Sequence, residues 1–121
     1  MSALLGITVI EIAERPAGEY AGKLLSDFGA EVIKVERPGG APTRHMGPFR
    51  ANDPERESAL FGYLNTNKKS VVLDLEDPED RAALDRLLAR AQGLIDDHDE
   101  AWGALRGLSP DGVAAAHPHL V

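Results

Sequence analysis

Residues 22–37, GKLLSDFGAEVIKVER, restrict the possible folds more than any other part of this chain. Apolar residues spaced by three and four predict a helix over Glu19–Phe28, and Gly29 is a natural end for it. The β-branched residues of Glu31–Glu36 predict a strand directly after the helix, and Ile7–Ile12 predicts another before it. A helix between two short strands implies a parallel pair joined by a right-handed crossover.

The rest of the chain continues this alternation of strands and helices. A third strand is predicted at Ser70–Leu75, a helix opens after Asp77, and a weaker strand is predicted at Gly93–Asp97. A last short helix spans Pro110–Ala116, and the final two residues resemble the start of another strand. The pattern predicts one α/β domain over residues 1–121, with a Rossmann-like, doubly wound, mostly parallel sheet that is incomplete at its C-terminal end.

The connection between the second and third strands is long and polar. Residues 38–58 are rich in proline and glycine and predict a surface loop, and a short helix is expected over Ala59–Asn65. Asn65, Asn67, Lys68 and Lys69 form a polar group before the third strand. Asparagines in turns most often bind loop backbone groups, so we interpret the two asparagines as structural and leave the role of the lysines open.

Composition and charge exclude several classes of protein. The 121 residues carry a formal net charge of -7, which argues against nucleic acid as a partner. No apolar run is long enough to span a membrane, and the start of the chain lacks the features of a signal peptide. There is no cysteine and therefore no disulfide framework. We expect a cytoplasmic protein that binds neither nucleic acid nor membrane.

The fold itself predicts where a ligand would bind. In open α/β sheets, ligands lie outside the carboxyl ends of the strands. The first such end leads into a helix N-terminus, where free N–H groups favour a phosphate, unless Gly18 serves only to make a turn. The rule selects four segments: Ala13–Gly18, Glu36–Gly40, Asp74–Glu76 and Asp97–Asp99.

The pair at the end of the second strand has the chemistry to bind a nucleotide. Arg37 can form two hydrogen bonds to a phosphate or stack on an adenine ring. Glu36 can accept a hydrogen bond from a ribose hydroxyl, as the corresponding acid does in dinucleotide-binding folds. The alternative is a solvated ion pair that contributes little.

A metal site is not expected. The four histidines are too scattered for a ligand motif, and the acidic run around Asp97 lacks the spacing of a calcium loop. Trp102, the single tryptophan, is predicted to be a packing residue.

Five sequence blocks in order resemble the amino-terminal part of the family III CoA-transferases, the CaiB/BaiF family. The resemblance covers essentially the whole chain. It implies a Rossmann-like domain that binds coenzyme A, and a ring-like homodimer whose substrates are an acyl-CoA and a small carboxylic acid. The blocks are L-x-G-x-x-V at Leu4–Val9, A-G at Ala17-Gly18, L-x-D-F-G-A-E-V-I-K-V-E at Leu25–Glu36, L-N-x-N-K-K-S-V-x-L-D-L at Leu64–Leu75, and the closing H-P-H-L-V.

The same resemblance implies which residues contact CoA. Arg37 matches an arginine that packs against the adenosine, and Leu73 matches an apolar contact with the adenine. Asp97 and His98 fall where the family has Asn-Phe, and Leu105, beside Arg106, falls where it often has an arginine. The loop that follows the first strand and contacts CoA corresponds to Arg15, Pro16 and Ala17.

The resemblance also implies what this segment lacks. The family's catalytic aspartate, which receives the acyl group, lies downstream, and no residue here matches it. Glu19 stands in place of a proline, and Asp97 adds a negative charge near the expected phosphates. Three hypotheses follow. The first is the CoA-binding part of a transferase or of a 2-methylacyl-CoA racemase-like enzyme, and the second is a CoA-binding module without catalysis. The third is an unrelated nucleotide-binding domain, which the missing glycine fingerprint disfavours.

Overall fold

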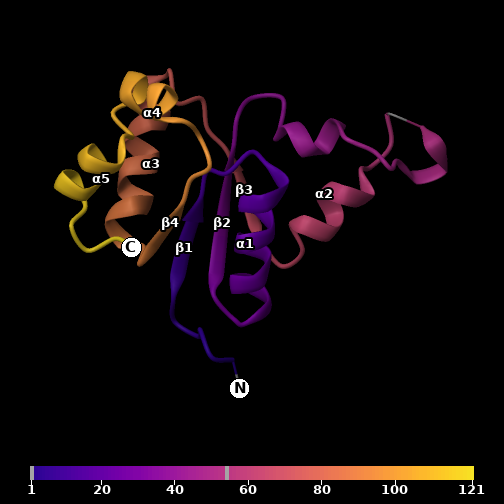
Figure 1. Cartoon of the computed structure of the whole chain (residues 1–121), viewed down its shortest axis with the longest axis horizontal. Helices are drawn as coiled ribbons and strands as arrows, with labels where there is room; N and C mark the ends of the chain where they lie inside the picture. Colours follow the sequence, from indigo (N-terminus) through magenta and orange to yellow (C-terminus); the bar gives the residue numbers. More distant parts are fainter. Residues whose placement is uncertain (1, 54) are drawn as a thin grey trace.

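The fold is a four-stranded parallel sheet with helices on both faces (Figure 1). The structure is a computed structural model that describes residues 2–53 and 55–121. The strand order β3-β2-β1-β4 places the first two strands at the centre, as in a Rossmann-like sheet. The strands are β1 Thr8–Glu11, β2 Glu31–Glu36, β3 Lys69–Val72 and β4 Gly93–Ile95. The α/β, doubly wound fold predicted from the sequence is confirmed.

Two groups of helices sandwich the sheet. In Figure 1, α1 and α2 lie to one side and α3, α4 and α5 to the other. The helices are α1 Pro16–Asp27, α2 Ala59–Leu64, α3 Pro78–Arg90, α4 Glu100–Arg106 and α5 Pro110–Ala116, with 3-10 turns at η1 Pro42–His45 and η2 Arg50–Asn52.

The side chains of β1 alternate between two apolar clusters. Ile10 and Ile12 pack with Leu84 and Leu88 of α3, whereas Val9 packs on the opposite face with Leu25 of α1. Because both faces are covered, polar residues inside these strands are buried as well.

Three element boundaries differ by two residues or more from those predicted. The helix α1 begins at Pro16 rather than Glu19, because a proline is well suited to the first position of a helix. Strand β3 ends at Val72 rather than Leu75, although the Leu73 N–H still donates to the Glu36 carbonyl oxygen at 2.9 Å. Strand β4 ends at Ile95 because the chain then turns away toward the start of α1.

The last residue of the chain pairs with β4. The Val121 N–H donates to the Gln92 carbonyl oxygen at 3.1 Å, and the Val121 carbonyl oxygen accepts from the Leu94 N–H at 3.0 Å. These bonds match the predicted start of a strand at this position. That the sheet is incomplete at this edge stays a prediction.

Four charged side chains form a buried charge cluster between the sheet and α1. Glu11 and Lys34 are register partners on β1 and β2, and their charged atoms lie 2.8 Å apart. Lys34 also contacts Glu19 of α1 at 3.2 Å, and Lys68 contacts Glu11 at 2.6 Å. None of the four side chains is more than 1% exposed. A Cβ added at Gly22 would lie 1.9 Å from Glu11 Oε1, so only glycine lets α1 approach this closely.

Desolvation has the largest effect on the pKa of Lys68. Burial lowers the pKa of Lys68, and the hydrogen bond and charge of Glu11 only partly compensate. Its ammonium group also donates to the Glu19 carbonyl oxygen and to Asn65 Oδ1, each at 2.8 Å. The structural role predicted for Asn65 is confirmed, and Lys68, left open in the sequence, is structural as well.

No helix in the part of the chain that the structure describes is long and apolar enough to cross a membrane.

Candidate functional site

A cavity of about 370 Å³ lies over the carboxyl ends of the strands. Each of the four segments selected by the strand-end rule contributes to its lining. Its other residues come from the ends of β1, β2 and β3 and from α4. The lining residues are Ile12, Glu14, Val35, Arg37, Pro38, Leu73, Asp74, Leu75, Glu76, His98, Trp102 and Arg106.

The lining of the cavity combines apolar, aromatic and cationic side chains. Leu73 is one of the apolar lining residues and is 7% exposed. The Trp102 indole stacks on the His98 ring at a centroid distance of 3.6 Å, and the Arg106 guanidinium lies 4.5 Å from the Trp102 centroid. Apolar and aromatic surface with a few convergent charges is typical of a site for a small molecule or cofactor.

Two residues of α4 have roles that the sequence did not reveal. Trp102 packs on the core as predicted, but it also lines the cavity. Leu105, where the resemblance implied an arginine, is 84% exposed, whereas the neighbouring Arg106 lines the cavity. The orientation of α4 about its own axis therefore directs Arg106, rather than Leu105, to the cavity.

Glu14 joins two of the predicted site residues. Its carboxylate accepts a 2.5 Å hydrogen bond from Arg37 Nε and lies 2.6 Å from His98 Nε2. Burial raises the pKa of Glu14, but the hydrogen bonds from Arg37 and His98 outweigh this and hold that pKa below its usual value. Sequence reasoning did not single out Glu14, although it lies in the first segment that the strand-end rule selected.

Not all of the predicted site residues come together. Arg37, Leu73 and His98 line the cavity. Arg15, Pro16, Ala17 and Asp97 are not among its lining residues in the described part of the chain. They lie at the start of α1, where Arg15 is the N-cap and Pro16 and Ala17 form the first turn. A contact between these residues and CoA stays a prediction.

Asp97 occupies the place where the sequence predicted a phosphate. Its two carboxylate oxygens accept hydrogen bonds from the N–H groups of Glu14 and Arg15, at 2.9 and 2.8 Å. A Cβ added at Gly18 would lie 2.7 Å from Asp97 Oδ2, so Gly18 is needed for close packing rather than for a turn. Within the chain, Asp97 thus acts as the anion at the N-terminus of α1.

The interpretation of Glu36 as a ribose-binding acid is wrong. Glu36 is 2% exposed, and its carboxylate accepts two hydrogen bonds from Arg44 at 2.6 and 2.8 Å. The Ala41 N–H and the Ser70 hydroxyl donate to it as well. Side chains alternate along β2, so Glu36 points away from the cavity and instead anchors the long segment after β2 to the sheet.

We expect this anchor to make stability depend on pH in the acid range. Burial opposes ionisation of Glu36, but the bonds from Arg44, Ser70 and Ala41 lower its pKa from 4.5 to about 2. The stabilisation is fully present above pH 4.5 and is lost as the pH falls toward 2. Because Arg44 is partly exposed, we expect a loss of about 2 kcal/mol.

Urea unfolding at pH 7, 4 and 3 measures this effect, with Glu36→Gln as the comparison. The variant should be less stable at pH 7, and its free energy of unfolding should decrease less as the pH falls. Parallel pH profiles for the two proteins would contradict the role of Glu36.

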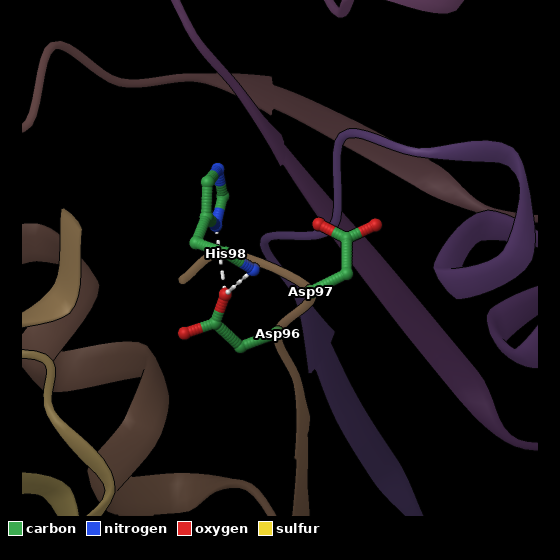
Figure 2. Close-up of side chains that lie close together, drawn as sticks. All are labelled: Asp96, Asp97 and His98. Carbon is green, nitrogen blue, oxygen red and sulfur yellow. Dashed lines mark hydrogen bonds and ion pairs between the residues drawn. The ribbon is translucent and has the colours of Figure 1, made fainter. Parts of the chain in front are cut away.

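Asp96, Asp97 and His98 place one potential metal ligand each within 4.8 Å of one another. Figure 2 shows the Asp96 carboxyl group beside His98 and the Asp97 carboxyl group apart from both. The Asp97 oxygens accept hydrogen bonds from the N–H groups of Glu14 and Arg15, just before α1. His98 Nδ1 lies 2.7 Å from Asp96 Oδ1. The donor atoms are thus engaged within the protein. That the chain holds no metal stays a prediction.

Comparison with known proteins gives a consistent set of relatives. The chain is 40% identical to succinate–glutarate CoA-transferase of Agrobacterium fabrum, a match that covers 98% of this chain and 30% of the relative. It is 38% identical to succinyl-CoA:mesaconate CoA-transferase of Haloarcula hispanica, over 92% of this chain and 30% of the relative. It is 34% identical to succinyl-CoA:glutarate CoA-transferase of Mus musculus, over 100% of this chain and 27% of the relative. The chain therefore spans about 30% of the length of these relatives.

Solved structures agree with this set. A CaiB/BaiF family protein from Brucella suis superposes with a TM-score of 0.88 at 34% identity, covering 99% of this chain and 32% of the other. The family model of CoA-transferase family III matches residues 4–121. The chain belongs to CoA-transferase family III.

Proposed function

We propose that residues 1–121 are the CoA-binding domain of an enzyme that moves CoA between an acyl-CoA and a small carboxylic acid. The observation that carries this proposal is the cavity over the strand ends, which joins apolar, aromatic and arginine side chains. The named activities of the relatives, all CoA transfers between carboxylic acids, support the reaction class. Catalysis would need residues beyond those of this chain.

The cavity suggests a role for each of its main residues. Leu73 offers an apolar surface to an adenine ring, and Trp102 offers an aromatic one. Arg37 and Arg106 supply the positive charge that phosphate groups require. A cytoplasmic location and a homo-oligomer remain part of the proposal, and sedimentation velocity of the full-length protein tests the second.

The proposal is tested by replacing Arg37. We expect Arg37→Ala to weaken CoA binding about 10-fold, because a charged hydrogen bond to a phosphate contributes about 1.5–3 kcal/mol and other contacts partly compensate. Isothermal titration of the chain with CoA measures the change. The matched control is Arg90→Ala, which removes an exposed arginine at the end of α3, away from the cavity.

Equal losses in Arg37→Ala and Arg90→Ala would indicate a general charge effect and would remove Arg37 from the site. If CoA fails to bind the unchanged chain at millimolar concentration, the proposed function of this segment is wrong.

A second candidate is a CoA-binding module without transferase activity. The observation that favours it is the presence of carboxylates beside the cations of the cavity, with Glu14 on Arg37 and Glu76 on Arg106. Transfer of CoA from succinyl-CoA to glutarate by the full-length protein would exclude this candidate.

A further inference from the structure

Glu14 differs from the other carboxylates of the cavity in how firmly it is held. Its side chain is 16% exposed and lies between Arg37 and His98, at 2.5 and 2.6 Å. Glu76, by contrast, is 71% exposed and contacts Arg106 at 3.1 Å. An exposed carboxylate turns into water at little cost, whereas a half-buried one with two partners does not.

Both arginines that line the cavity, within the described part of the chain, already have carboxylate partners. Arg37 pairs with Glu14, Arg106 pairs with Glu76, and His98 lies between Glu14 and Asp96. An anionic ligand therefore cannot simply add its charge to free cations. At Arg37 it has either to displace Glu14 from Nε or to bind the other guanidinium N–H groups beside the charge of Glu14.

We propose that Glu14 is a specificity-determining residue that competes with the phosphates of the ligand for Arg37. This inference rests on the proposed function and deepens it. A phosphate that reaches Arg37 meets the negative charge of Glu14 nearby, whether or not it takes over the Nε hydrogen bond that Glu14 now accepts. A nucleoside without phosphates does not compete with Glu14 for Arg37. Glu14 thus weakens the binding of phosphorylated ligands selectively and leaves the binding of the adenosine moiety unchanged.

The test compares Glu14→Gln with the unchanged chain by calorimetric titration. The probes are CoA, adenosine 3′,5′-bisphosphate and adenosine. Glutamine keeps the shape and an oxygen acceptor for Arg37 but removes the charge. We expect Glu14→Gln to bind CoA and the bisphosphate about 3- to 10-fold more tightly, with adenosine unchanged.

The control is Glu31→Gln, which removes the same charge from an exposed pair with Lys69 at the beginning of β2. It should leave the affinity for all three probes unchanged. If Glu14→Gln does not fold, NMR of the unchanged chain gives the answer. The bisphosphate should shift the Arg37 Nε–H resonance and the Glu14 carboxyl carbon, and adenosine should shift neither.

Each outcome decides the proposal. Unchanged or weaker binding of the phosphorylated probes by Glu14→Gln would overturn it, as would an equal gain for adenosine. CoA binding that depends on Arg37 but not on Glu14 would leave the proposed function standing and refute this inference alone. If no probe binds either protein, both are refuted.

Discussion

Replacing Lys34 with methionine is expected to lower the free energy of unfolding by about 3–5 kcal/mol. Lys34 is 1% exposed and neutralises two buried carboxylates, those of Glu11 and Glu19. Without it, Lys68 is left as the one lysine of the buried charge cluster, and one carboxylate remains buried without a counter-charge. The Glu19 side chain makes this worse, because within the described residues its Oε1 has no hydrogen-bond partner even in the intact protein.

The matched control is Lys69→Met. Lys69 also pairs with a glutamate from a strand position, Glu31 at 2.7 Å, but its side chain is 70% exposed. We expect a change below about 1 kcal/mol, as for exposed ion pairs in general. Urea unfolding of both variants measures the difference, and similar losses would show that burial of the cluster contributes nothing special.

A third variant tests the cause. Adding Glu19→Gln to Lys34→Met removes the uncompensated carboxylate and should restore part of the lost stability. No recovery would indicate that Lys34 acts through packing of its alkyl chain rather than through its charge.

The second large effect is expected at the centre of the core. Leu84 of α3 is 0% exposed and packs in the cluster that contains Ile10 and Leu88. Leu84→Ala should lower the free energy of unfolding by about 3–4 kcal/mol, because it removes buried apolar surface and leaves a cavity. Thermal and urea unfolding measure the loss.

Leu105→Ala is the control, since it makes the same change on a helix where the leucine is 84% exposed. Its effect should stay within about 0.5 kcal/mol. A loss at Leu105 as large as that at Leu84 would mean that Leu105 is covered in solution, for example by another copy of the chain.

The architecture follows from local sequence signals. The apolar spacing before Gly29 predicted the end of α1 to within one residue, and the β-branched residues after it predicted β2 at its observed limits. The alternation of strands and helices then predicted the parallel sheet, since successive parallel strands need a crossover. Each of these signals acts over a few residues, where backbone preference and side-chain period suffice.

The sequence also predicted where the site lies, but not how its charged side chains pair. Each of the four segments that the strand-end rule selected contributes to the cavity, because the rule depends on topology alone. It did not distinguish Arg37, which faces the cavity, from the adjacent Glu36, which is buried on the other face. Nor did it predict that Asp97 would bind the backbone just before α1 from a position more than 80 residues away in sequence.

The sequence by itself determined the order of elements, the class of sheet and the edge where a ligand would bind. Only the tertiary structure decided how the charges pair. Glu11 meets Lys34 and Lys68 across 23 and 57 residues, and these distances are spanned by strand register and helix packing. A sequence shows charged residues within strands of a doubly covered sheet, which indicates burial. It does not show their partners, because ion pairs form between residues that only the completed fold brings within 3 Å.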